Sequence, residues 1–148
     1  RDGLMTAATK SFGATAVGTD AIHMVRSDVF APCALGAGLN DETIPLLKAS
    51  IVAGSANNQL AEARHDEMLA AQGILYAPDY VINAGGIINI AHEGPDYDRD
   101  AAFDHVTRIG GTLTGLFRRA TREGIPTGAM ADRMAQEALG KAAQTLAA

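Results

Sequence analysis

The sequence is short of several residue types, and each shortage excludes a class of protein. A single cysteine, Cys33, excludes an internal disulfide and fits a reducing compartment. Twelve Lys and Arg against 17 Asp and Glu give a net charge of -5, which argues against a nucleic-acid surface. No apolar run reaches the roughly 18 residues of a membrane span, and no signal-peptide pattern opens the chain. We therefore expect a soluble, cytoplasmic protein without nucleic-acid or membrane partners.

Small and apolar residues take the place of the scarce ones. Hydrophobic residues make up 47% of the 148, aromatic residues only 5%, and 16 are glycine. Such a chain can bury an ordinary core. Its many small residues favour close backbone packing, either between helices and a sheet or around a bound cofactor.

Short apolar runs rich in β-branched residues alternate with helical stretches, which is typical of βαβ units and a mostly parallel sheet. The predicted strands span residues 15–17, 29–32, 51–53, 74–77 and 80–82. We therefore predict an α/β fold with a partial, Rossmann-like parallel sheet and flanking helices. Ligands of such sheets bind beyond the carboxyl ends of the strands.

Helical periodicity predicts a helix before Gly13, one after residues 40–43 and one over 60–72. Long C-terminal helices follow, over 99–123 and then from a cap at Thr127. Gly110, Gly111 and Gly115 interrupt the first of these, each at a cost of about 1 kcal/mol relative to Ala. We therefore expect tight contact with another element at these glycines.

Three segments, 30–43, 53–59 and 76–90, place small residues and carboxamides directly after predicted strands. Small residues let a planar ligand approach the backbone, and Asn can both donate to and accept from it. The alternative interpretation of each segment is an ordinary turn. Their occurrence at successive strand ends favours a shared cleft.

The remaining ionisable residues give no catalytic pattern. The four histidines, at positions 23, 65, 92 and 105, lack the regular spacing of a metal site, so we predict no metal. Asp41, Glu42 and Thr43 are interpreted as helix-start residues. Cys33 is interpreted as a small buried residue with no base nearby to activate it.

Six motifs follow one another along the chain: APCALG, LNDETIP, AGSANNQL, RH, YAPDYVINAGG and IN. In wording, order and spacing they resemble the family of leucine, phenylalanine and valine dehydrogenases. Within it they are most similar to the leucine dehydrogenase branch. The resemblance extends from about Gly13 to the C-terminus. It implies NAD-dependent, reversible oxidative deamination of an L-amino acid to its 2-oxo acid and ammonia. It also implies a homo-oligomer.

The resemblance also implies a division of labour. Family members carry catalytic lysines and an aspartate in an amino-terminal domain, and this chain matches only the later part of their NAD-binding domain. We expect residues 1–97 to hold its sheet and 98–148 to form its C-terminal helices. On this view the chain has no catalytic residue of its own, is inactive alone and binds NAD weakly. The choice between NAD and NADP stays open, because the ribose-binding segment is absent.

Site residues follow from the same motif positions. Ala34 and Leu35 resemble the backbone segment that lines the adenosine side of the cofactor. Asn57 resembles the asparagine at the nicotinamide ribose and nicotinamide end, and Asn83 the one that approaches the nicotinamide carboxamide and the substrate. Ile87 and Ile90 resemble the pair that faces the substrate side chain. Two isoleucines on one helix face favour an aliphatic, branched-chain substrate over a charged one.

Other functions remain open at this point. The chain can be a non-catalytic nucleotide-binding or regulatory domain derived from this family, or a segment of a phenylalanine or glutamate dehydrogenase. A glutamate enzyme would be expected to carry a polar residue at Ile90. Ile87 and Ile90 could also be plain core residues, and the motif position is what favours a pocket.

Overall fold

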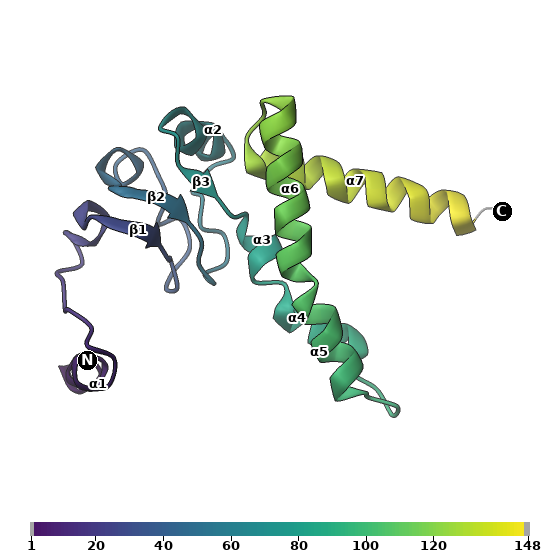
Figure 1. Cartoon of the computed structure of the whole chain (residues 1–148), viewed down its shortest axis with the longest axis horizontal. Helices are drawn as coiled ribbons and strands as arrows, with labels where there is room; N and C mark the ends of the chain where they lie inside the picture. The colour runs from purple at the N-terminus through teal and green to yellow at the C-terminus, as the bar shows by residue number, and fades with distance from the viewer. Residues whose placement is uncertain (1, 147–148) are drawn as a thin grey trace.

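The computed structural model describes residues 2–146 and is built on a three-stranded parallel sheet in the order β1-β2-β3 (Figure 1). The strands are β1 (Ser27–Phe30), β2 (Ala49–Val52) and β3 (Leu75–Tyr76). In register, Val29 of β1 lies opposite Ile51 of β2, and Ile51 lies opposite Leu75 of β3. The predicted α/β class is confirmed, as are the strands expected at 29–32, 51–53 and 74–77, with shifted bounds.

Helices make up most of the remaining chain. They are α1 (Asp2–Phe12), α2 (Arg64–Ala71), α3 (Asp79–Ile82), α4 (Gly85–His92), α5 (Arg99–Thr107), α6 (Ile109–Glu123) and α7 (Thr127–Leu146), with 3₁₀ turns at Ile22–Met24 and Ile44–Leu46. In Figure 1, α2 lies beside β3, α6 runs down the middle of the molecule, and α7 extends away from it. Among residues 2–146, no helix combines the length and the apolar character needed to cross a bilayer.

Two predicted strands are wrong. Residues 15–17 are exposed and form no regular structure, because no neighbouring strand in the described chain pairs with them. Residues 80–82 belong to α3. Pro78 stands as its N-cap in an extended conformation, and the backbone N–H of Ile82 donates to the Pro78 carbonyl at 3.0 Å. A proline before a helical turn outweighs the strand preference of the two β-branched residues that follow.

The predicted helices lie in helical parts of the chain, but their number and bounds differ from those observed. The helix expected over 60–72 begins only at Arg64, and the helix expected after residues 40–43 is a single 3₁₀ turn over Ile44–Leu46. The helix expected over 99–123 is two helices, α5 and α6, which meet at Arg108. The predicted end at residue 123 is confirmed, and Gly124 follows as the C-cap in the left-handed conformation, at a φ of 67°.

Tight contact at the α6 glycines is also a wrong prediction. A Cβ added at Gly110, Gly111 or Gly115 would meet nothing within 4 Å in the described chain. The side of α6 that packs lies elsewhere, because Leu116 and Ala120 are buried with Met130 and Ala131 of α7. Val81 of α3 packs against this cluster, which joins the C-terminal helices to the sheet half.

The sheet half has its own core, formed by seven buried residues: Leu39, Ile44, Leu47, Val52, Leu69, Ile74 and Tyr76. Polar contacts then connect the two halves. The Thr127 hydroxyl donates to the backbone oxygen of Tyr76 at 2.7 Å, so Thr127 is not the predicted cap. The first turn of α7 is capped by Asp66 of α2, whose carboxylate accepts the Ala129 N–H at 3.1 Å. Burial raises the pKa of Asp66.

Candidate functional site

Two asparagine side chains meet at the carboxyl edge of the sheet. Asn57 lies in the loop after β2, and Asn83 is the C-cap of α3, which follows β3. The Asn83 Nδ2 donates to the Asn57 Oδ1 at 2.6 Å and lies 3.3 Å from the backbone oxygen of Ser55. Parallel strands bring the residues after their ends to the same edge, which is why positions 26 residues apart come together.

A cavity of about 520 Å³ opens beside this pair. Asn57 and Asn83 line it together with Ile87 and Ile90 of α4, so four of the six predicted site residues share one space. Ile87 is 66% exposed and Ile90 60% exposed, although both are large and apolar. The two isoleucines are therefore wall residues of a cavity in this chain and not members of its core.

Ala34 and Leu35 lie outside this cavity. Both are exposed, and Leu35 is 88% exposed. Their loop nevertheless packs beside the Asn57 loop, since the Ala37 N–H donates to the Asn58 oxygen at 2.6 Å. Their assignment to the adenosine side stays a prediction.

The loops after β1 and β2 approach each other very closely. A Cβ added at Gly54 would lie 2.2 Å from the backbone oxygen of Pro32, which leaves room for glycine alone. Next to this contact, a hydrogen bond with Ser55 lowers the pKa of the Cys33 thiol. Cys33 is exposed, so the prediction that it is buried was wrong: it lies in the irregular loop after β1 and not in the sheet.

Two residues that the sequence analysis did not single out, Gln59 and Asp79, hold these loops in shape. Gln59 is 1% exposed, and its Nε2 donates to the backbone oxygens of Gly54 at 2.7 Å and Ala56 at 3.0 Å. Asp79 is 9% exposed and accepts hydrogen bonds from the Asn58 N–H and the Tyr76 hydroxyl. Both residues lie within the family motifs AGSANNQL and YAPDYVINAGG, which could have drawn attention to them. Their hydrogen-bond partners, however, are known only from the structure.

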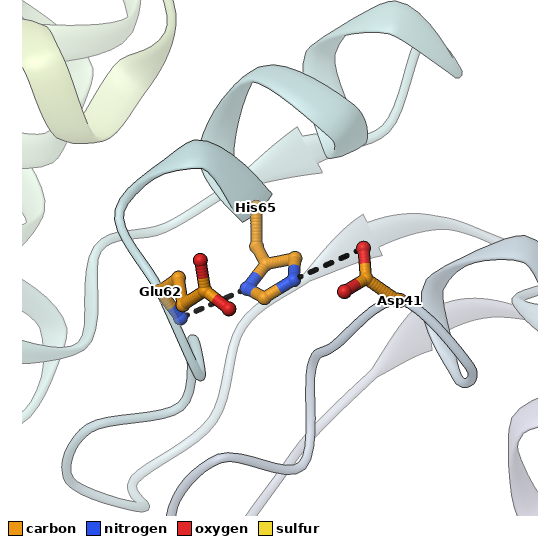
Figure 2. A group of neighbouring side chains, drawn as sticks. All are labelled: Asp41, Glu62 and His65. Carbon is orange, nitrogen blue, oxygen red and sulfur yellow. Dashed lines mark hydrogen bonds and ion pairs between the residues drawn. The ribbon is translucent and has the colours of Figure 1, made fainter.

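A second polar cluster lies between the loop after β1 and the start of α2 (Figure 2). The His65 side chain, 1% exposed, has its Nδ1 accepting the Glu62 N–H at 2.9 Å and its Nε2 3.6 Å from an Asp41 oxygen. Arg64 forms ion pairs with both Asp41 and Glu62. These contacts lower the pKa of both carboxyl groups, chiefly through the hydrogen bonds from Arg64.

Asp41, Glu62 and His65 place three ligand-type atoms within 4.8 Å of one another, which raises the question of a metal. The hydrogen-bond pattern argues against one. A neutral imidazole that binds a metal through Nε2 carries its proton on Nδ1, yet Nδ1 here accepts a backbone N–H. The Arg64 guanidinium also already forms ion pairs with both carboxylates. The cluster therefore acts as a clamp that fixes the start of α2 to the loop after β1.

Two further histidines, predicted to be scattered, are paired by the fold. The His92 Nε2 of α4 lies 3.1 Å from the His105 Nδ1 of α5. The pair joins the helix that carries Ile87 and Ile90 to its neighbour in the helical half.

Comparison with known proteins agrees with this geometry. Residues 2–97 match the model of the Glutamate/Leucine/Phenylalanine/Valine dehydrogenase family. The chain is 55% identical over 130 residues to leucine dehydrogenase from Thermoactinomyces intermedius, covering 88% of this chain and 36% of that enzyme. It is 49% identical over 125 residues to valine dehydrogenase from Streptomyces albus, covering 84% of this chain and 34% of that enzyme.

A solved structure extends the match to three dimensions. The crystal structure of L-tryptophan dehydrogenase from Nostoc punctiforme superposes with a TM-score of 0.88 at 47% identity, over 92% of this chain and 41% of that one. The chain thus spans little more than a third of the length of the curated relatives it matches. The motifs, the parallel sheet and the family match together place this chain in the Glutamate/Leucine/Phenylalanine/Valine dehydrogenase family.

Proposed function

We propose that this chain is the nicotinamide-side part of the NAD-binding domain of an L-amino-acid dehydrogenase. The observation that carries the proposal is the pairing of Asn57 with Asn83. The two hydrogens of the Asn83 amide are directed to Ser55 and Asn57, which leaves its Oδ1 as an acceptor. The Asn57 Oδ1 accepts from Asn83, which leaves its Nδ2 as a donor.

One free donor beside one free acceptor is the complement of a primary carboxamide, which itself offers one of each. The nicotinamide ring carries such a group. The residues present therefore fit the nicotinamide end of the cofactor, and Asn57 and Asn83 would hold it. When bound, NAD supplies the acceptor for the hydride that leaves the substrate.

The chain's own contribution is to bind, orient and exclude water. Ile87 and Ile90 line the same cavity as the carboxamide pair, so a substrate beside the nicotinamide would meet an apolar wall. A charged side chain would lose hydration there without gaining a partner. This supports an aliphatic, branched-chain amino acid as substrate, with its 2-oxo acid and ammonia as products.

The names of the related dehydrogenases include aliphatic amino acids but do not single out one substrate. Leucine and valine dehydrogenases match this chain at about 50% identity, but so does L-tryptophan dehydrogenase. Overall identity therefore does not separate aliphatic from aromatic substrates. The two isoleucines are what favours the aliphatic choice.

The catalytic lysines and aspartate of the proposed enzyme would come from an amino-terminal domain, and the protein would act as a homo-oligomer. Residues 1–97 would form the sheet part of the NAD-binding domain and 98–148 its C-terminal helices. The exposure of Ile87 and Ile90 supports this division, because a second wall is needed to close the cavity around a substrate.

Steady-state kinetics of the full-length protein that carries this segment test the proposal. The substrates are Leu, Val, Ile, Phe, Trp and Glu, each with NAD and with NADP. We expect the highest kcat/KM with a branched aliphatic amino acid and NAD. Preference for Glu or for an aromatic substrate would refute the substrate assignment, and absence of turnover with all six would refute the dehydrogenase assignment.

The 148-residue chain by itself provides a second test. Under the proposal, the pyrophosphate turn and the acidic residue that holds the ribose lie outside this chain, so calorimetry should show weak NAD binding or none. Micromolar affinity would contradict the view that the remaining contacts to the cofactor come from outside this chain.

A further inference from the structure

We infer that Asp79 is a positioning residue that sets the geometry of the Asn57–Asn83 carboxamide pair without touching the cofactor. The inference rests on the proposed function and deepens it. Asp79 is connected both to the loop after β2 that carries Asn57 and to the helix that carries Asn83. Among the described residues, Asp79 alone accepts a hydrogen bond both from Asn83 and from Asn58, the chain neighbour of Asn57.

The first connection runs through the side chain. The Asp79 Oδ2 accepts the backbone N–H of Asn58, the residue next to Asn57, at 2.5 Å. Hydrogen bonds to a carboxylate are stronger than those between neutral groups. This bond spans 21 residues of sequence and fastens the loop after β2 to the start of α3.

The loop needs such a fastening because of its backbone conformation. Asn58 has a φ of 51°, in the left-handed region that residues other than glycine rarely adopt. Asparagine tolerates this conformation better than most residues, but the surroundings must hold it. The bond to Asp79 and the hydrogen bond from the Ala37 N–H to the Asn58 oxygen hold it from its two sides.

The second connection runs through the main chain. The Asp79 carbonyl accepts the Asn83 N–H at 2.9 Å, which closes the single turn of α3. One residue therefore fixes Asn58 through its carboxylate and Asn83 through its carbonyl. The 2.6 Å contact between the Asn57 and Asn83 amides lies between these two points.

Asp79 is a positioning residue because its own acceptors are engaged. Its Oδ2 bonds to Asn58, and its Oδ1 accepts the Tyr76 hydroxyl at 3.0 Å. Burial is the largest cause of a raised pKa of Tyr76, so this hydroxyl keeps its proton and remains a donor. With both oxygens bound and 9% of the residue exposed, Asp79 is built to hold the loop.

This geometry predicts an effect confined to one end of the cofactor. Loss of the Asp79 bonds would misplace Asn57 and Asn83, which face the nicotinamide carboxamide under the proposed function. ADP-ribose lacks that carboxamide, so its binding should not depend on Asp79. The ratio of the NADH and ADP-ribose dissociation constants therefore separates positioning from a general loss of structure.

The experiment uses the full-length protein with Asp79→Asn, which retains the shape of the side chain but can replace only one of the two accepted bonds. We expect the Kd for NADH to rise about tenfold and kcat to fall by a similar factor. The Kd for ADP-ribose should stay within about twofold. In an Asn83→Ala background, Asp79→Asn should change NADH binding by less than about twofold, since the pair is already lost.

Tyr76→Phe is the second variant, because it removes one donor to Asp79 and leaves the Asn57 loop untouched. It should raise the Kd for NADH about threefold with ADP-ribose unchanged. If Asp79→Asn does not fold by circular dichroism, the Tyr76→Phe ratio decides, and an unchanged ratio overturns the inference.

Other outcomes are separable. If the unsubstituted protein binds NADH and the Asp79→Asn variant binds it equally well, the positioning role is overturned and the proposed function stands. Equal weakening of NADH and ADP-ribose also overturns it. Failure of the unsubstituted protein to bind NADH at all overturns both.

Discussion

The sheet half and the helical half of this chain are held together in different ways. In the sheet half, seven buried residues form a core beneath loops whose polar groups are bonded to one another at the carboxyl edge of the strands. In the helical half, a smaller cluster centred on Leu116 and Met130 joins α6 to α7, while the α6 glycines face open space. The larger buried core therefore lies in the half that carries the asparagine pair, and the long helices pack through a smaller cluster.

Two glycines, one in each half, should differ most in their effect on stability when replaced by alanine. Gly54→Ala should destabilise the protein by at least about 3 kcal/mol, because the new Cβ would lie 2.2 Å from the Pro32 oxygen. Gly115→Ala, inside α6 and with nothing within 4 Å, should stabilise it by about 0.5–1 kcal/mol. Urea denaturation of both variants measures the difference. Destabilisation by Gly115→Ala would mean that another element packs on that face after all.

The helical half should depend strongly on one buried side chain. Met130 is 0% exposed, and Met130→Ala should cost about 2–3 kcal/mol through lost burial and the cavity left behind. Leu139→Ala on the same helix is the control, since Leu139 is 71% exposed and its loss should cost less than about 0.5 kcal/mol. Equal effects in thermal denaturation would show that α7 is not anchored at its first turns.

Catalytic activity should depend on the asparagine pair at the carboxyl edge of the sheet. In the full-length protein, Asn83→Ala should lower kcat/KM for NAD about tenfold to hundredfold, because it removes both the acceptor and the support of Asn57. Asn89→Ala is the matched control on α4, where the side chain bonds to Glu93 and Tyr97. A wild-type kcat/KM for Asn83→Ala would remove the basis of the nicotinamide assignment.

The smallest expected effect concerns the contact between the halves. Asp66 caps α7, and replacement by Ala should cost about 1 kcal/mol. Since burial raises the pKa of Asp66 in the folded state, the folded protein binds this proton more tightly than the unfolded chain. Stability from this group should therefore be greatest below the unfolded pKa, near 3.8, and be lost as pH rises through the folded value.

Urea denaturation of the wild type and of Asp66→Ala across a pH series tests the sign. The free-energy difference in favour of the wild type should grow as pH falls towards the unfolded pKa. A difference that shrinks over the same range would show that hydrogen bonds from α7 lower the pKa of Asp66 more than burial raises it.

Local patterns predicted much of this chain because they report on local physics. Short apolar runs marked β1, β2 and β3, and helical periodicity marked the end of α6 at residue 123. The same rules failed where a competing local signal was stronger, as at residues 80–82 after Pro78. They also failed where a neighbouring element was assumed: a pairing strand for residues 15–17 and a tightly packed element at the glycines of α6.

The sequence by itself determined the fold class, the family resemblance and the motif positions of Asn57, Asn83, Ile87 and Ile90. Only the tertiary structure decided which of them share a cavity, and that Asp79 joins the two asparagine-bearing segments. The physical reason is distance along the chain. Helix and turn preferences act over a few residues, whereas the bonds from Asn58 to Asp79 and from Ala129 to Asp66 span 21 and 63 residues.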